Sequence, residues 1–521
     1  MEEIMEQLIK PASDEMIKEL DERFEAGKQR VLATESEWTL GEGGTIYYIS
    51  ANGSDENDGR SPEQALKSFA KINTDGFLKA GDVVLLERGC RWHGRIETKP
   101  YVTYSAYGKG DKPMICGSID AAKPTDWEQW GKYSYIYKYT GFIPGNKQNE
   151  DGIWPIANDV GNIVFNDGMA HGVRILKYET KDVNIHLGYN GLASNKMEFW
   201  YRGEEEFHDA NDLKHNLEFY FDYRTGELFL CSLYGNPGEI FDGIELCMKG
   251  NVVRGVSGVT LDNLCIRYGA SHGMGAGTCK DLVIRNCEVG WIGGSIQFIS
   301  NNWPTRFGNA IEIYGGCDNY KIYNNYIYQV FDCGPTVQWQ GKLDTENDQV
   351  ILERNIEIYD NVIERCDSPM EVWLTTPDCT ETSYALLKNI CLHDNLCRYS
   401  GYGFGGYMHQ KCDYNMFYGA GETKAKYEDA YIENNYMWYI RLYVHFAVPT
   451  NVKNGLGFNW RNNTIIKPYG SEFSLLGEDY ENAKGHFKLY HYTDETLKML
   501  MDGGCIGENR FYHHMKSELE K

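Results

Sequence analysis

The middle of the chain repeats a short pattern built around an asparagine. In each copy a short strand precedes the asparagine, and a second strand and a turn follow it; the asparagines are Asn263, Asn286, Asn325, Asn361, Asn395, Asn435 and, in a weaker copy, Asn463. The first two are 23 residues apart, and the later spacings are 39, 36, 34, 40 and 28 residues. A unit of about two dozen residues with inserted loops is typical of a parallel β-solenoid.

Asparagine suits such a repeat for two reasons. It tolerates a left-handed backbone, and its side-chain amide can bond to the asparagine of the next rung. A β-propeller would need longer antiparallel blades joined by hairpin turns, which these repeats lack. The sequence therefore predicts an all-β fold made of parallel rungs.

Two parts of the chain resemble a known superfamily. The first contains IYYISANGSDENDGRSPEQALKSFAKIN, AGDVVLLERGCRWHGRIE and VTYSAYGKGDKPMI, and the second contains the asparagine repeats. Together, residues 45–116 and 250–470 resemble the pectin-lyase-like right-handed parallel β-helix superfamily, and most of all its glycosidase branches. The resemblance implies a right-handed solenoid. It leaves the reaction open, because the superfamily includes lyases, polygalacturonases, glycosidases, epimerases and phage tailspikes.

The remaining segments do not follow the repeat. Residues 12–32 predict an amphipathic helix with Ser13 as its N-cap, which we expect to cover the open N-terminal end of the solenoid. Residues 118–249 predict antiparallel strands and hairpins, and residues 493–502 a short helix. The expected organisation is an N-terminal helix and linker (1–44), the start of the β-helix (45–117), an inserted β-rich subdomain (118–249), the main β-helix with the cleft (250–470) and a C-terminal segment (471–521).

Composition and charge narrow the partners. The chain carries 51 basic and 75 acidic residues, a net charge of −24, which disfavours nucleic acids and acidic polysaccharides. No stretch approaches the ~20 apolar residues that span a bilayer, and the acidic N-terminus lacks the pattern of a signal peptide. We therefore expect a cytoplasmic protein that binds no nucleic acid or membrane. Its 15 cysteines form no CxxC pair, so we expect free, mostly buried thiols.

Strand alternation predicts a column of polar side chains on one outer face. In GNAIEIYG, GPTVQWQG and SPMEVWL the apolar residues point inward, which leaves Glu312, Gln338 and Glu371 pointing outward on three successive rungs. Asp332 and Asp367 occupy matching places in VFDCGP and ERCDSP, in the turns before two of these strands. Carboxylates crowded in this way repel one another, and this favours the protonated form that a general acid needs.

The rung spacing of ~4.8 Å suggests which carboxylates react. Asp332 and Asp367, one rung apart, approach the ~5–5.5 Å of a retaining glycosidase pair. Glu312 and Glu371, two rungs apart, approach the upper limit for an inverting pair. We expect Asp332 and Asp367 to be catalytic, with Glu371 as the leading substitute and Glu312 as a supporting carboxylate.

Substrate contacts are predicted around the same rungs. The segments 297–306, 341–354 and 375–383 are long insertions, which build cleft walls in many enzymes. We expect hydrogen bonds to a sugar from amides and an imidazole, and contacts to its faces from aromatic rings; the residues are Gln338, Gln340, His272, Trp303, Trp373 and Tyr314.

These features favour a glycoside hydrolase that cleaves a neutral oligosaccharide, without a cofactor or metal. A polysaccharide lyase that uses calcium and a Lys or Arg base such as Lys411 stays open, as does a solenoid that only binds glycans. The expected partner is a carbohydrate, and association into a homo-oligomer stays open.

Overall fold

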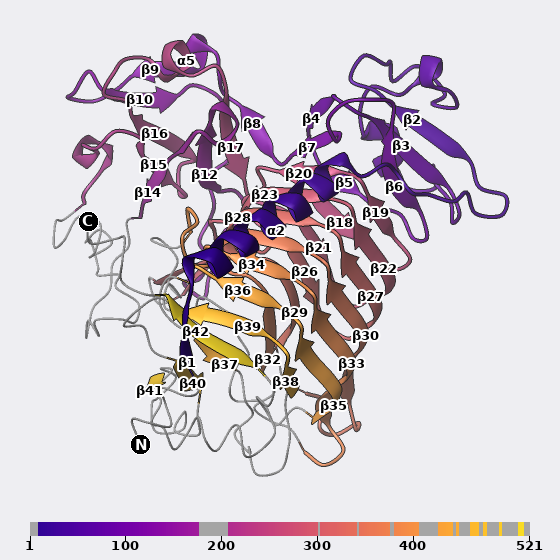
Figure 1. The fold of residues 1–521 in the computed structure, drawn as a ribbon. Helices are drawn as coiled ribbons and strands as arrows, with labels where there is room; N and C mark the ends of the chain where they lie inside the picture. The colour runs from indigo at the N-terminus through magenta and orange to yellow at the C-terminus, as the bar shows by residue number, and fades with distance from the viewer. Residues whose placement is uncertain are drawn as a thin grey trace.

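In the computed structural model the chain forms three long stacks of strands, and a long α-helix lies on one of them (Figure 1). The structure describes residues 9–176, 207–300, 303–340, 343–375, 380–405, 426–440, 444–446, 459–467, 473–476, 489–491 and 509–514.

Three parallel sheets form the solenoid. A full turn of the chain passes through all three and adds one strand to each. Sheet A runs in the order β4 (Arg91–His93), β7 (Met114–Cys116), β20 (Cys265–Arg267), β23 (Glu288–Ile292), β28 (Tyr326–Cys333), β31 (Val362–Ser368), β34 (Leu396–Arg398), β36 (Tyr436–Trp438), β39 (Thr464–Lys467), β42 (Arg510–His514) and β1 (Ile9–Ala12).

Sheet B has the order β2 (Ile46–Ile49), β3 (Val83–Glu87), β6 (Thr103–Tyr107), β19 (Thr260–Asp262), β22 (Lys280–Arg285), β27 (Cys317–Tyr323), β30 (Val350–Tyr359), β33 (Tyr384–His393), β35 (Lys426–Glu433) and β38 (Asn459–Arg461). Sheet C has the order β5 (Ile96–Glu97), β18 (Val253–Gly255), β21 (Met274–Ala276), β26 (Ile311–Tyr314), β29 (Pro335–Gln340) and β32 (Glu371–Thr375). The mostly parallel pairing agrees with the predicted all-β solenoid.

One hydrophobic core fills the solenoid. It takes the inward residues of all three sheets, including Ile311, Ile313, Val337, Met370 and Val372 of sheet C. The alternation read from the sequence therefore assigns these strand faces correctly, and Glu312 lies on the outer face between two core isoleucines.

An asparagine ladder joins the rungs where sheet B turns into sheet A. Each side-chain amide donates to the next side-chain oxygen, as from Asn325 to Asn361 at 2.9 Å and from Asn361 to Asn395 at 3.0 Å. The ladder continues through Asn435 and Asn463 to Asn509, which the repeat had not revealed.

The first two repeats need a one-residue correction. Arg285 pairs with Tyr323, so Asn286 is level with Asn324, not with Asn325. Asn263, Asn286 and Asn324 themselves have positive φ. In the later rungs the residue before the ladder asparagine is left-handed, as at Asp360. In the later rungs, one residue therefore adopts the left-handed backbone and the next residue supplies the amide of the ladder.

Helix α2 (Asp14–Ala33) forms where the sequence predicts a helix, and Ser13 caps it by accepting from Met16 N at 3.1 Å. It does not cover the open N-terminal end of the solenoid. It runs along the stack of strands on the outer face of sheet A, as Figure 1 shows, because that face carries its own apolar stripe. Against that stripe the helix buries Ile17, Leu20, Phe24 and Val31; the stripe consists of Tyr326, Val362, Leu396, Trp438 and Ile466.

Strand β1, just before the helix, pairs in parallel with β42, the last described strand of the solenoid. The N-terminal segment thus covers the C-terminal edge of sheet A. Such an edge would otherwise offer unpaired backbone groups to other chains.

Residues 118–249 build two smaller sheets outside the three stacks, with cores of their own. One sheet contains β14 (Val173–Ile175), β15 (Glu218–Asp222), β16 (Glu227–Cys231), β10 (Ile136–Tyr139) and β9 (Trp127–Gln129). The other contains β13 (Ala170–His171), β12 (Val160–Phe165), β17 (Ile244–Met248) and β8 (Ser118–Asp120). All pairs except β14 with β15 are antiparallel.

Smaller elements complete the described chain. They are the helices α3 (Ala70–Asn73) and α5 (Pro237–Ile240), the strands β11 (Trp154–Pro155), β24 (Ser295–Ser300) and β25 (Trp303–Phe307), and a sheet of β37 (Val444–Phe446), β40 (Phe473–Leu476) and β41 (Leu489–His491). The helix predicted at 493–502 lies outside the described residues. Among those described, no helix has the length and apolar character to cross a membrane, and the cysteines are free, with nine of twelve buried.

Candidate active site

A cleft of about 950 Å³ opens over the outer face of sheet C. Its floor comes from β18, β21, β26 and β29, and the hairpin β24–β25 supplies a wall. The hairpin contains most of the 297–306 insertion, which the sequence predicts to flank the site. Polar groups from Glu312, Asp332, His272, Asn309 and Gln338 line the cleft.

The column of outward residues differs from the predicted one by two positions in β29. Thr336, not Gln338, pairs with both Glu312 and Glu371. Gln338 pairs instead with Tyr314 on one side and Trp373 on the other. A shift of two residues keeps a side chain on the same face of a strand, so alternation alone could not detect it.

Glu312 is held by two neutral donors. Asn309 Nδ2 donates to its Oε2 at 2.6 Å, and Thr336 Oγ1 donates to the same oxygen at 2.9 Å. The side-chain oxygen of Asn309 also accepts from the backbone N–H of Cys333 at 2.9 Å. Asn309 thus joins Glu312 to the strand that carries Asp332. No motif indicated Asn309, because it stands alone before a buried strand.

His272 lies beside this group in its neutral form. Burial lowers the pKa of its imidazole to about 4, although attraction to Asp332 opposes the shift. Its Nδ1 accepts a hydrogen bond from the backbone N–H of Asn309 at 3.1 Å, which places the proton on Nε2. The 3.9 Å between Nδ1 and Glu312 Oε2 is therefore not an ion pair.

Asp332 and Asp367 end two neighbouring strands of sheet A. The sequence placed them in turns, but they belong to β28 and β31. Val330 pairs with Cys366 and Cys333 with Ser368, so β28 carries one extra residue, a β-bulge, at this point. Bulges re-aim side chains near strand ends. Asp332 lines the cleft, and Asp367 is almost wholly buried on the next rung.

Glu371 extends the carboxylate cluster by another rung. It is almost wholly buried, and Gln338 Nε2 donates a short hydrogen bond to its Oε2. Since Gln338 also lines the cleft, it connects Glu371 to that space. The structure therefore brings Glu312, Asp332, Asp367 and Glu371 to adjoining strands at one corner of the solenoid.

Aromatic rings border the cleft. Tyr314 is 40% exposed and Phe298 41% exposed, and Phe307 packs edge-on against His272 with ring centroids 5.1 Å apart. The sequence predicted Tyr314 but neither phenylalanine. The side chains of Trp303, Trp373 and Gln340, and all of Lys411, lie outside the described residues.

Arg306 attaches the cleft wall to the solenoid. Its guanidinium is buried, donates through Nε to the carbonyl of Gly294 at 2.8 Å, and lies 4.3 Å from the centre of the Phe331 ring. Phe331 immediately precedes Asp332. This packing links the position of the hairpin to that of the carboxylate.

Comparison with known proteins gives only distant structural similarities. No protein-family model matches the chain, and no curated protein matches it in sequence. The structure of XylC in complex with xylose is 12% identical, with a TM-score of 0.44 over 83% of this chain and 70% of that one. A GH136 lacto-N-biosidase from Eubacterium ramulus is 14% identical, with a TM-score of 0.35 over 96% and 71%. A rhamnogalacturonan lyase is 11% identical, with a TM-score of 0.34 over 81% and 74%. These values are too low to carry an argument about the reaction.

Proposed function

We propose that this chain is a glycoside hydrolase that cleaves a neutral oligosaccharide at the cleft on sheet C. The observation that carries the proposal is the gathering of four buried carboxylates at one corner, two of which line the cleft. Hydrolysis of a glycosidic bond needs two such groups, one as an acid and one as a nucleophile or base. The net charge of −24 favours a neutral sugar over an acidic polymer.

Glu312 and Asp332 are the proposed reacting residues, because a catalytic group has to reach the substrate and both line the cleft. Two hydrogen-bond donors on one oxygen stabilise a carboxylate in its ionised form, so Glu312 is the nucleophile. Asp332 is the acid that protonates the leaving oxygen and then activates water. Asp367 supports Asp332 from the next rung, and Gln338 contacts the sugar while it orients Glu371.

His272 and the rings complete the proposed binding site. Neutral His272 can donate through Nε2 to a sugar hydroxyl, and Tyr314 and Phe298 present ring surface to the C–H faces of a sugar. The two predicted tryptophans, Trp303 and Trp373, are proposed to extend this surface.

The first test is digestion of a panel of neutral oligosaccharides, followed by mass spectrometry of the products. A hydrolase adds one water to each cleaved bond. An unsaturated product that absorbs in the near ultraviolet would identify a lyase instead, and an intact but retained glycan a binding protein. Either of these results contradicts the proposal.

The second test is the anomeric configuration of the first-formed product, measured by proton NMR. We propose retention, with Glu312 and Asp332, which line the same cleft, as the reacting pair. Reaction through Asp332 and Asp367, on adjacent rungs, would also retain the configuration. Inversion would point to Glu312 and Glu371, two rungs apart.

Azide separates the two roles in a retaining enzyme. In Glu312→Ala, azide can take the place of the nucleophile and give a glycosyl azide of inverted configuration. In Asp332→Ala, azide can attack the glycosyl-enzyme and give the retained configuration. The opposite pattern would exchange the roles of the two residues.

A further inference from the structure

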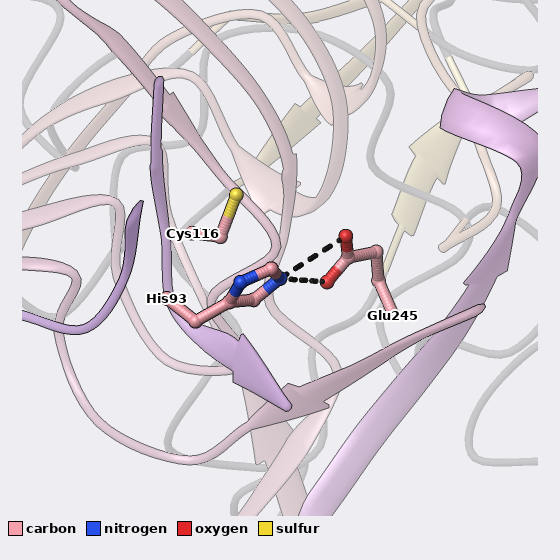
Figure 2. Close-up of side chains that lie close together, drawn as sticks. All are labelled: His93, Cys116 and Glu245. Carbon is pink, nitrogen blue, oxygen red and sulfur yellow. Dashed lines mark hydrogen bonds and ion pairs between the residues drawn. The ribbon is translucent and has the colours of Figure 1, made fainter. Parts of the chain in front are cut away.

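A second group of chemically versatile side chains lies where the 118–249 insertion meets the solenoid. His93 ends β4 and Cys116 ends β7, and the two are directly paired on adjacent rungs of sheet A. Glu245 reaches them from β17 of the insertion, which lies between β12 and β8 in its sheet. Three separate strands thus deliver one imidazole, one thiol and one carboxylate to a single place (Figure 2).

The ligand atoms of these three residues converge. His93 Nε2 is 2.9 Å from Glu245 Oε2 and 3.3 Å from Oε1. Together with the sulfur of Cys116, they all lie within 4.8 Å of one another. Ligand atoms around a tetrahedral Zn²⁺, at 2.0–2.3 Å from the ion, are separated by about 3.3–3.8 Å. Small side-chain rotations would bring the three atoms to that separation.

From this geometry we propose that His93, Cys116 and Glu245 form a binding site for a divalent transition-metal ion of the Zn²⁺ type. Nitrogen, thiolate sulfur and carboxylate oxygen are the donors that such ions take, whereas Ca²⁺ and Mg²⁺ require oxygen alone. With three protein ligands, the fourth position falls to water. Water can reach the site from the His93 side, because the His93 side chain is 31% exposed, whereas Cys116 and Glu245 are buried.

The surroundings hold the carboxylate in place. Ser118 Oγ donates to Glu245 Oε2 at 2.5 Å, and Arg91 Nη1 lies 3.3 Å from Oε1. Contacts of this kind orient the ligands at metal sites. Arg91 also pairs with Asp167, so part of its positive charge is already balanced, and binding adds the negative charge of the Cys116 thiolate.

The protons balance simply. In the metal-free protein the Nε2–H of His93 donates to Glu245, and Cys116 is a thiol. Binding moves the imidazole proton to Nδ1 and releases the thiol proton to solvent, and the ion gains one sulfur, one nitrogen and one oxygen bond. The bound ion would join the first rungs of the solenoid to the insertion, a role separate from catalysis on sheet C.

Spacing along the chain could not indicate this site. Cys116 follows His93 by 23 residues, and Glu245 follows Cys116 by 129. Metal motifs recognised in sequence place ligands a few residues apart. Only the return of the insertion to the solenoid brings Glu245 beside the other two.

The test is a titration of the full chain, freed of metal with a chelator, with Co²⁺ as the spectroscopic probe. We expect a thiolate-to-cobalt charge-transfer band that saturates at a single ion per chain and disappears when Zn²⁺ is added. Cys116→Ser should abolish the band, and His93→Gln should weaken cobalt binding by at least ~10-fold. Cys90→Ser, at a half-buried thiol outside the cluster, is the matched control and should keep the band.

Two results would overturn the proposal: a wild-type protein without the thiolate–cobalt band, or a band that persists in Cys116→Ser. Circular dichroism checks that each variant folds. If Cys116→Ser fails to fold, substitution of the partly exposed His93 decides the question, and unchanged cobalt affinity in His93→Gln rejects the site.

Discussion

Sheets A and C are built from the same rungs, but acidic residues on their outer faces have different hydrogen-bond partners. On sheet A, Glu364 Oε2 accepts from Arg398 Nε at 3.0 Å, and the same guanidinium bonds to Asp21 and Glu25 of helix α2. On sheet C, Glu312 Oε2 accepts from the Asn309 amide and from the Thr336 hydroxyl. In the first arrangement a guanidinium joins acids of the sheet and of the docked helix, whereas in the second an amide and a hydroxyl hold a carboxylate in place.

Apolar residues sharpen the contrast. The outer face of sheet A carries the stripe from Tyr326 to Ile466 that helix α2 covers, and the outer face of sheet C carries a cleft over β18, β21, β26 and β29. The inward residues of both sheets enter one core and serve one purpose. Outward positions do not pack the core, so they can serve a helix contact on one sheet and a cleft on the other.

The largest effect on stability is expected under the helix. Trp438 is fully buried, packs edge-on against Phe24 with centroids 5.9 Å apart, and donates to Asp21 at 3.0 Å. Trp438→Ala should lower the free energy of unfolding by about 3–5 kcal/mol, measured by urea denaturation. The folded fraction should keep its activity, because Trp438 on β36 is not among the residues that line the cleft.

Tyr234→Ala, at a ring 79% exposed, is the control and should change the stability by less than ~0.5 kcal/mol. Equal effects of the two substitutions would mean that the helix is not packed as described.

A substitution in the cleft should instead lower activity and change stability little. Asp332→Asn should lower kcat/KM by at least ~100-fold, about 2.7 kcal/mol in the barrier, with little loss of stability. Asp318→Asn changes a carboxylate on sheet B that pairs with Arg354, and it should leave activity intact. Near-wild-type activity of Asp332→Asn on a substrate that the native chain cleaves would remove Asp332 from the mechanism.

Acid should lower the free energy of unfolding through His272, which lines the cleft. The folded pKa of about 4 lies below the ordinary value of 6.5, so between these pH values the unfolded chain binds a proton that the folded one does not. Stability therefore falls as the pH drops from 6.5 to 4, by up to about 3 kcal/mol from this residue. His272→Gln should flatten that part of the pH–stability curve, and an unchanged curve would argue against a buried neutral imidazole.

The smallest effect is expected for an exposed charge pair on the outer face of sheet B. Lys388 Nζ lies 2.7 Å from Glu428, and both side chains are about half exposed. Lys388→Ala should cost no more than ~0.5 kcal/mol, and salt should reduce the difference further. A loss above 1 kcal/mol would show that exposed charges on these rungs matter more than the comparison implies.

The repeats allowed most of the solenoid to be predicted. Parallel pairing and the inward residues of sheet C agree with the sequence reading, because alternation and a burial requirement act on each strand locally. The register between neighbouring strands could not be predicted in the same way. The register of β29 differs from the predicted one by two residues, the alignment of Asn286 differs by one, and β28 carries a bulge at Asp332. Each of these depends on the lengths of the loops that connect neighbouring rungs.

The repeat, the helix after Ser13 and the acidic residues of the outer face could be predicted from the sequence, since periodicity and capping act over a few residues. The position of the helix along sheet A, the link from Asn309 to Glu312 and the Asp332 strand, and the meeting of Glu245 with His93 and Cys116 became visible only in the folded chain. Each of these depends on contacts between segments far apart in the chain, which form only when the rungs have stacked.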